Sequence, residues 1–139
     1  MNEVSRGKFS EAALSLLRIV TGLLFLEHGA QKLFGWLVET GPTAMPRHAV
    51  HFPELPWFAG VLEFFGGLLV MLGLFTRPVA FLLSGEMAVA YFMVHAKNGF
   101  WPILNRGELA VLYCFVFLFL AANGGGSYGL GRAVRRSRL

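Results

Sequence analysis

Residues 23–36, LLFLEHGAQKLFGW, close a strongly apolar segment and place an acid, an imidazole, an amide and an amine among leucines and phenylalanines. The segment begins near residue 12, so it exceeds the roughly 20 residues that a helix needs to cross a bilayer. Polar groups inside such a helix are costly in lipid and are expected to face a partner or a polar cavity. The stretch therefore predicts a membrane-spanning helix with one polar face.

The composition of the whole chain supports a membrane protein. Hydrophobic residues make up 55% and charged residues 14%, against about 45–50% and about 25% in soluble domains. The net charge of +4 lies mostly at the chain ends, and we interpret it as attraction to lipid headgroups. The basic tail GRAVRRSRL has no aromatic residue on which a base could stack. The bilayer is thus the expected partner, and nucleic acid is not. Cys114, the single cysteine, excludes an internal disulfide and a CxxC redox pair.

Three further apolar stretches follow the first. We expect one all-α domain over residues 1–139, an integral membrane four-helix bundle with spans at about 12–36, 57–76, 78–95 and 107–122. Regular helices are predicted because the bilayer interior offers no water to unpaired backbone groups. The apolar start runs past the roughly 7–15 residues of a signal-peptide core and is expected to remain as the first span. The proline-rich connection 37–56 is predicted to lie outside the membrane, residues 76–78 to form a tight hairpin, and the glycine-rich stretch after residue 122 to be flexible.

The distribution of basic residues predicts the orientation. Seven Lys and Arg flank the spans on the side of both termini and four on the other side, and all three tryptophans fall on that other side. This asymmetry favours cytoplasmic termini in a multi-pass protein of the bacterial inner membrane. Counted along the first span, Arg18 lies far enough from the outer interface to reach the cytoplasmic one. Snorkelling of its side chain toward lipid headgroups would explain a charged residue at this position.

The acidic residues are predicted to converge in the outer half of the bundle. At 1.5 Å per residue, Glu27, Glu63 and Glu86 lie roughly 13, 9 and 16 Å below the outer interface. Glu108 and His95 lie near the outer rim. Glu108 also fits a capping box, with Asn105 as the cap residue. His95 follows Glu86 by nine residues, which is half a turn out of phase on a regular helix.

A polar pocket beneath an aromatic rim suits a small amphipathic molecule with hydrogen-bonding oxygens, such as a quinol. Glu63 and Glu86 are the candidate catalytic residues because a carboxylate can accept a quinol proton. The candidate ligand-binding residues are Glu27, His28, Lys32, His95 and Glu108. The chain has no evident redox centre of its own, so this hypothesis of a quinone-linked oxidoreductase component includes a protein partner or redox complex that delivers electrons.

The sequence leaves the cofactor open, with quinone favoured over haem or a metal. A haem between His28 and His95 would need ligands that differ in depth by roughly 9 Å. A carboxylate-bridged di-metal site would need Glu-x-x-His on two helices, and the sequence has no such motif.

Two other functions stay open. The chain could be a non-catalytic structural subunit of a larger membrane complex, whose buried charges pair helices. A transporter of a small anion using Lys32 and Arg18 is less favoured, because the sequence shows neither a broken helix nor an internal repeat.

Four stretches together are similar to the DoxX family of small four-helix bacterial membrane proteins: LLRIVTGLLFLEHGAQKLFG, GVLEFFGGLLVMLGLFTRPVAF, GEMAVAYFMVH and NRGELAVLYCFVFLFLAANGGGSYGLG. The resemblance covers nearly all of residues 14–131. The positions that match the family pattern are Arg18, His28, Gly29, Lys32, Glu63, Gly67, Gly73, Thr76, Arg77, Glu86, Tyr91, His95 and Glu108. Near the end, Gly125 and Gly131 stand where the family commonly has proline and aspartate.

The resemblance implies the fold and the membrane location. Members of the family are similar to the small subunit of a thiosulfate:quinone oxidoreductase, and others accompany quinone-detoxification or oxidative-stress complexes. It therefore also implies a quinone-linked redox role.

Overall fold

The computed structural model describes residues 3–37 and 49–131. These residues form the helices α1 (Glu3–Phe34), α2 (Leu55–Leu72), α3 (Thr76–Ala90), α4 (Pro102–Asn105) and α5 (Glu108–Asn123). A π-helical turn, Tyr91–His95, and a 3-10 turn, Ala96–Asn98, continue α3. The described ranges contain no strand, so the all-α prediction is confirmed. Most of the proline-rich connection (38–48) and the basic tail (132–139) lie outside the described residues.

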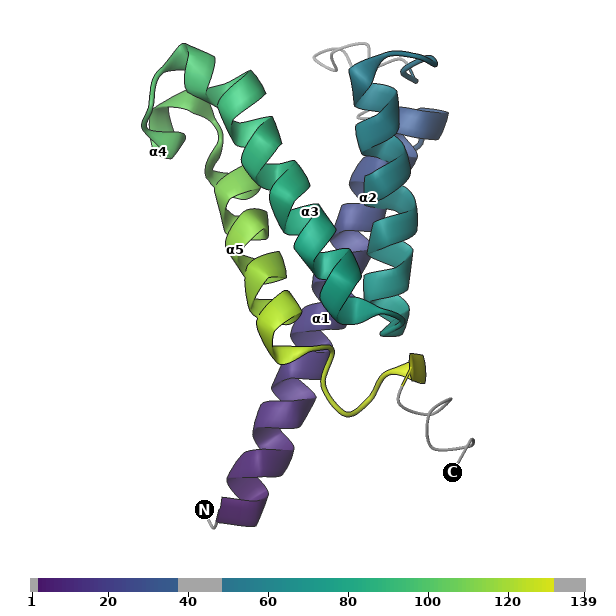
Figure 1. Ribbon diagram of the computed structural model, residues 1–139, viewed down its shortest axis with the longest axis vertical. Coiled ribbons are helices and arrows are strands. Elements are labelled where there is room, and N and C mark those ends of the chain that lie inside the picture. Colours follow the sequence, from purple (N-terminus) through teal and green to yellow (C-terminus); the bar gives the residue numbers. More distant parts are fainter. Residues whose placement is uncertain (1–2, 38–48, 132–139) are drawn as a thin grey trace.

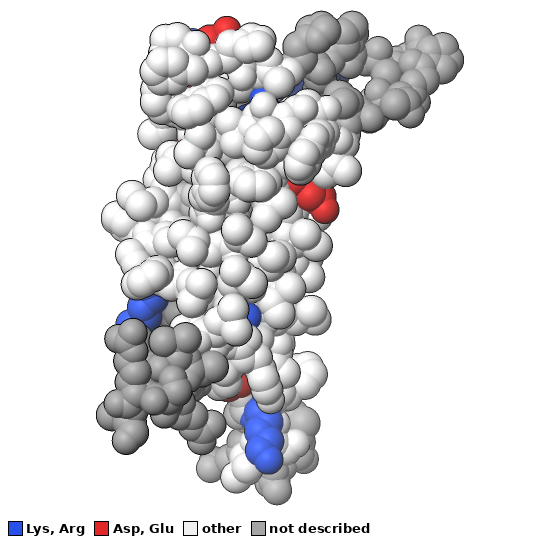
Figure 2. Space-filling view, turned by 90° about the vertical axis from the view of Figure 1, so that its right-hand side faces the viewer, with Lys and Arg blue, Asp and Glu red and all other residues white. Residues whose placement is uncertain are grey.

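Three helical segments are long and apolar enough to cross a membrane by length and composition: Gly7–Phe34, Leu55–Leu72 and Thr76–Asn98. The fourth long segment, α5, is apolar but has 16 residues, which is about 24 Å of helix. Figure 2 shows that the middle of one face of the molecule is almost free of charge, with Lys and Arg near its lower end. This distribution is what a bilayer around the middle of the molecule requires.

The long helices form two pairs, α1 with α2 and α3 with α5. The pairs lie close together near the end where α1 begins and diverge toward the other end (Figure 1). Between them, Phe25 of α1 packs its ring against Phe117 of α5, with ring centroids 4.7 Å apart. Both rings are almost completely buried, so this contact forms the core that joins the two pairs.

Glycines bring α1 and α2 into backbone contact. A Cβ atom on Gly22 would lie 2.7 Å from the carbonyl oxygen of Gly67, and a Cβ on Gly67 would lie 2.6 Å from the backbone nitrogen of Leu26. Small residues at such positions allow the close approach on which helix association in lipid depends. The α1–α2 pair is therefore fixed in register at positions where side chains would not fit.

The connection between α2 and α3 lies three residues before the predicted hairpin. The helix α2 ends at Leu72, and Gly73 follows in the left-handed conformation with φ 74°. Phe75, with φ 48°, precedes α3, which begins at Thr76. The prediction of a hairpin at residues 76–78 was wrong because glycine terminates α2 ahead of the proline on which that prediction was based.

Arg18 does not snorkel. Its side chain is 1% exposed and donates hydrogen bonds from Nη1 to the carbonyl oxygens of Val70 and Met71, at 3.1 and 3.0 Å. These carbonyls belong to the last turn of α2, where backbone oxygens lack helical partners. The guanidinium therefore caps α2, and its positive charge opposes the negative end of the helix dipole.

The glycine-rich stretch after α5 is ordered, contrary to the prediction of a flexible segment. The carbonyl oxygen of Tyr128 accepts a hydrogen bond from Arg18 Nη2 at 2.9 Å, and Ser127 Oγ donates to Glu11 at 2.6 Å. A Cβ on Gly125 would lie 2.8 Å from Arg18 Cδ. The glycines are thus needed because the chain crosses directly over Arg18.

Replacing Arg18 with methionine is expected to lower the free energy of unfolding by about 2 kcal/mol, since charge-assisted hydrogen bonds to three backbone carbonyls are lost. Helical circular dichroism during titration with sodium dodecyl sulfate in mixed micelles measures this change. Arg77→Met is the matched control, because Arg77 lies near the same end of the molecule and is exposed. Equal losses in both variants would contradict the capping role.

Asn105 organises the segment between α3 and α5, and it is not the cap residue of α5. It ends α4, and α5 begins at Glu108 without a side-chain cap hydrogen bond. Its buried side chain donates to the carbonyl oxygen of Gly99 at 2.7 Å and accepts from the backbone N–H of Gly107 at 2.8 Å. The predicted capping box at Glu108 was therefore wrong.

Candidate functional site

An ion pair between a partly exposed lysine and a buried glutamate joins α1 and α2. Lys32 Nζ lies 2.5 Å from Glu63 Oε1, and the side chains are 35% and 3% exposed. Lys32 is in the last turn of α1, and Glu63 lies midway along α2. Gly60 precedes Glu63 by one turn, and a Cβ there would lie 3.0 Å from Lys32 Cβ. The glycine therefore makes room for the lysine stem beside the glutamate.

Glu86 of α3 lies close enough to this pair for the charges of Glu63 and Lys32 to act on its carboxyl group. Both carboxyl oxygens of Glu86 and Oε2 of Glu63 are buried, and none has a hydrogen-bond partner within residues 3–37 and 49–131. Buried polar groups in proteins are nearly always hydrogen-bonded. Three buried carboxyl oxygens without a partner among the described residues, near one ammonium group, therefore make this the candidate site for a hydrogen-bonding ligand.

Tyr113 brings α5 into the same region. Its side chain is 7% exposed, and its ring stands perpendicular to that of His28, with centroids 6.1 Å apart. The charges of Glu27 and Glu63 act on its hydroxyl group. The central cluster, as we name it, comprises Glu27, His28, Lys32, Glu63, Glu86 and Tyr113, to which each of the four long helices contributes.

Sequence reasoning missed Tyr113. The signal was present, because Ala110, Tyr113 and Phe117 recur at helical spacing and are buried on one face of α5. Tyr113 is the polar member of that face.

His95 is held apart by its own contacts. Its Nδ1 lies 3.2 Å from the carbonyl oxygen of Asn105, and its ring stacks on Tyr91. The π-helical turn Tyr91–His95 inserts an extra residue into the helix. The half-turn offset from Glu86 that regular geometry predicted therefore does not apply.

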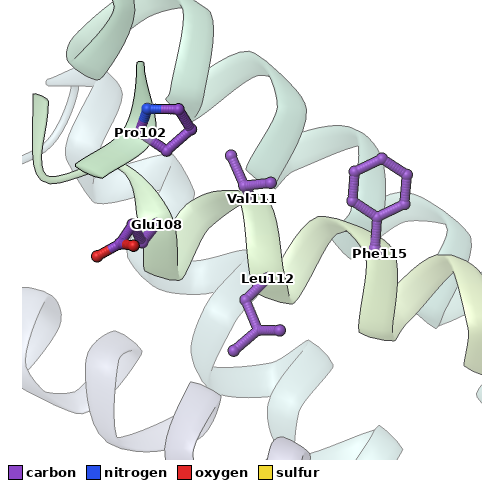
Figure 3. Close-up of a pocket in the computed structure, with 5 residues that line it drawn as sticks. All are labelled: Pro102, Glu108, Val111, Leu112 and Phe115. Carbon is purple, nitrogen blue, oxygen red and sulfur yellow. The ribbon is translucent and has the colours of Figure 1, made fainter. Parts of the chain in front are cut away.

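Glu108 does not join the central cluster. It is exposed and lines a surface pocket of about 450 Å³ with Pro102, Val111, Leu112 and Phe115 (Figure 3). The predicted convergence of four acids therefore does not include Glu108. Within the described residues, no three His, Cys, Asp or Glu side chains are grouped as ligands of one metal ion.

The central cluster can carry out two kinds of chemistry. Its carboxyl groups can accept or donate protons, and its ammonium, imidazole and phenol groups can donate hydrogen bonds to a carbonyl oxygen. In an apolar surrounding, such hydrogen bonds are stronger than in water.

Comparison with known proteins gives a consistent set of relatives. The DoxX family model matches residues 13–96. An uncharacterized protein of Haemophilus influenzae is 43% identical over 127 residues, which cover 88% of this chain and 91% of that protein. The inner membrane protein YqjF of Escherichia coli is 27% identical over 133 residues, which cover 93% and 97%.

A Bacillus subtilis relative carries the name "Putative oxidoreductase CatD" and is 28% identical over 120 residues, with 84% and 83% covered. No solved structure gives a significant match to the chain. The family match, the relatives in bacterial membranes and the three apolar helices agree on a multi-pass protein of the bacterial inner membrane. The chain belongs to the DoxX family.

Proposed function

We propose that this DoxX protein is the membrane component of a quinone-linked oxidoreductase and that the central cluster binds the quinone headgroup. The observation that carries the proposal is the Glu86 carboxyl group, buried without a hydrogen-bond partner among the described residues and close to the Lys32–Glu63 pair. The name of the Bacillus subtilis relative as an oxidoreductase supports the same class of reaction.

The roles follow from the charges. Lys32 and His28 orient the quinone by donating hydrogen bonds to its carbonyl oxygens, and Glu63 and Glu86 exchange protons with the ring oxygens. Reduction of the quinone takes two electrons and two protons. The electrons come from a partner redox protein, and the protons pass through the two carboxyl groups. Tyr113, beside His28, closes the site on the α5 side.

The topology that accompanies this proposal is a four-helix bundle in which α5 also crosses the membrane and both termini are cytoplasmic. The start of α1 and the described segment after α5 lie toward the same end of the molecule (Figure 1). The sequence bias of basic residues toward that end supports its cytoplasmic location. The central cluster then opens toward the outer leaflet.

Replacing Glu86 with glutamine tests the proposal. We expect quinone affinity to fall about tenfold, because the protonated carboxyl group of Glu86 that donates a hydrogen bond to a quinone carbonyl oxygen is replaced by an amide, which is a weaker donor and cannot pass on a proton. Quenching of tryptophan fluorescence by an added short-chain quinone in detergent measures the affinity. Glu54→Gln is the control, since Glu54 is exposed before α2. Unchanged quinone affinity in the Glu86→Gln protein would refute the site.

A non-catalytic structural subunit is the second candidate, and the Lys32–Glu63 pair between α1 and α2 favours it. Under this function, Glu63→Gln would lower stability in detergent by removing the charge that pairs with Lys32, and quinone binding would be undetectable in both the parent and the variant. Thermal unfolding measured beside the quinone titration therefore separates the two candidates.

A further inference from the structure

The surface pocket between α4 and α5 has one polar end and one apolar end. Glu108 and Pro102 lie at one end, Phe115 lies at the other, and Val111 and Leu112 lie between them (Figure 3). From Glu108 to Phe115 the α5 axis advances by about 10 Å. The pocket therefore follows the helix and fits a molecule with a polar head and an apolar chain.

The polar end lies at the depth of the lipid headgroups. Trp101, immediately before α4, and Ile103 and Leu104 within it are 65%, 72% and 75% exposed. Exposed tryptophan and aliphatic side chains beside a short helix are typical of the membrane interface. Glu108, the first residue of α5, starts at this level, and the rest of the pocket runs toward the bilayer interior.

Buried hydrogen bonds hold the rim of the pocket in place. Asn105 is 5% exposed and ties Gly99 to Gly107 through its side chain. The hydroxyl group of Tyr91 donates to the carbonyl oxygen of Phe100. The segment that carries Pro102 is thus held against α3 and α5, so one side of the open surface pocket has a fixed backbone.

The charged side chains beside the pocket determine which lipid headgroup it favours. The carboxylate of Glu108 disfavours a headgroup that is purely anionic and favours one with an ammonium group. Arg106, two residues earlier and also exposed, offers a guanidinium group that can bind a phosphate. We propose that this pocket binds a zwitterionic aminophospholipid, with the ammonium group on Glu108, the phosphate near Arg106 and one acyl chain along Val111, Leu112 and Phe115.

The ammonium must be able to donate hydrogen bonds to the carboxylate. A primary ammonium, as in phosphatidylethanolamine, has three N–H donors, whereas the quaternary ammonium of phosphatidylcholine has none. Phosphatidylglycerol has no cation. We therefore expect the affinity of the pocket to decrease from phosphatidylethanolamine to phosphatidylcholine to phosphatidylglycerol. This order does not depend on the quinone proposal.

Native mass spectrometry of the purified protein in detergent, titrated with these three lipids carrying identical palmitoyl and oleoyl chains, tests the inference. We expect phosphatidylethanolamine to bind about three- to fivefold more tightly than phosphatidylglycerol, the range of an exposed ion pair. Glu108→Gln should remove the preference, and Glu54→Gln, which changes an exposed glutamate outside the pocket, should keep it.

Leu112→Trp provides a second variant that does not depend on charge. Leu112 is 61% exposed, so the indole can fill the pocket without disturbing the core, and binding of phosphatidylethanolamine should decrease. Equal affinity for phosphatidylethanolamine and phosphatidylglycerol would overturn the proposal, as would a preference that survives Glu108→Gln. Displacement of the lipid by a short-chain quinone at equal concentration would assign the pocket to quinone instead.

Discussion

Lys32→Met should lower the free energy of unfolding by about 3 kcal/mol or more, because removal of one partner of a buried ion pair leaves the other charge uncompensated. Glu63 is 3% exposed and would keep both carboxyl oxygens without a partner among the described residues. Titration with sodium dodecyl sulfate in mixed micelles, followed by helical circular dichroism, measures the loss.

A second substitution distinguishes loss of the pair from loss of the lysine stem. In the double variant Lys32→Met with Glu63→Leu, both charges are absent, and we expect most of the stability to return. Lys97→Met controls for the removal of a positive charge, because Lys97 is exposed. A double variant no more stable than Lys32→Met would show that the charge of Glu63 is not the cause.

Gly29→Ala should destabilise the protein by about 2–3 kcal/mol, the cost of forcing extra volume into a packed contact. The added Cβ would lie 2.7 Å from the Cα of Phe64 and 2.8 Å from the carbonyl oxygen of Gly60. Backbone atoms cannot move aside as the end of a side chain can, so α1 and α2 must separate. The Lys32–Glu63 pair is one turn from this contact, and quinone affinity should fall with stability.

Gly85→Ala is the matched control for this substitution. Gly85 also lies inside a helix, α3, but a Cβ atom added there would have no atom of a neighbouring element within 4 Å. Alanine has the higher helix propensity by about 1 kcal/mol, so this variant should be as stable as the parent or slightly more stable. Opposite signs for the two glycine substitutions are the expected result, and a loss of stability in both would contradict the close helix contact.

Hydropathy predicted the helices well because length and composition alone decide which segments can cross a bilayer. The span predicted at 107–122 corresponds to α5, Glu108–Asn123. The end of α2 was missed by four residues, since the left-handed Gly73 terminates that helix before the proline of the next. A glycine near the end of an apolar helix commonly marks its C-terminus, so the sequence did indicate where α2 ends.

The candidate site was predictable in part. Depth along each helix placed Glu27, Glu63 and Glu86 in the outer half of the bundle, and the structure pairs Glu63 with Lys32 and has Glu86 near that pair. The depth of a residue along its helix does not identify its hydrogen-bond partner, however. Arg18 was therefore interpreted as facing headgroups, although it caps α2. That contact joins residues more than 50 positions apart in the sequence and depends on packing that no local pattern encodes.

Photocrosslinking with an azido-quinone, followed by mass spectrometry of the labelled peptides, tests most directly whether the central cluster binds quinone. We expect labels on α2 and α3 peptides that contain Glu63 and Glu86, suppressed by excess unlabelled quinone and strongly reduced in the Glu86→Gln protein. Labels confined to the pocket of Glu108 and Phe115, or labels that excess quinone does not suppress, would contradict quinone binding by the central cluster.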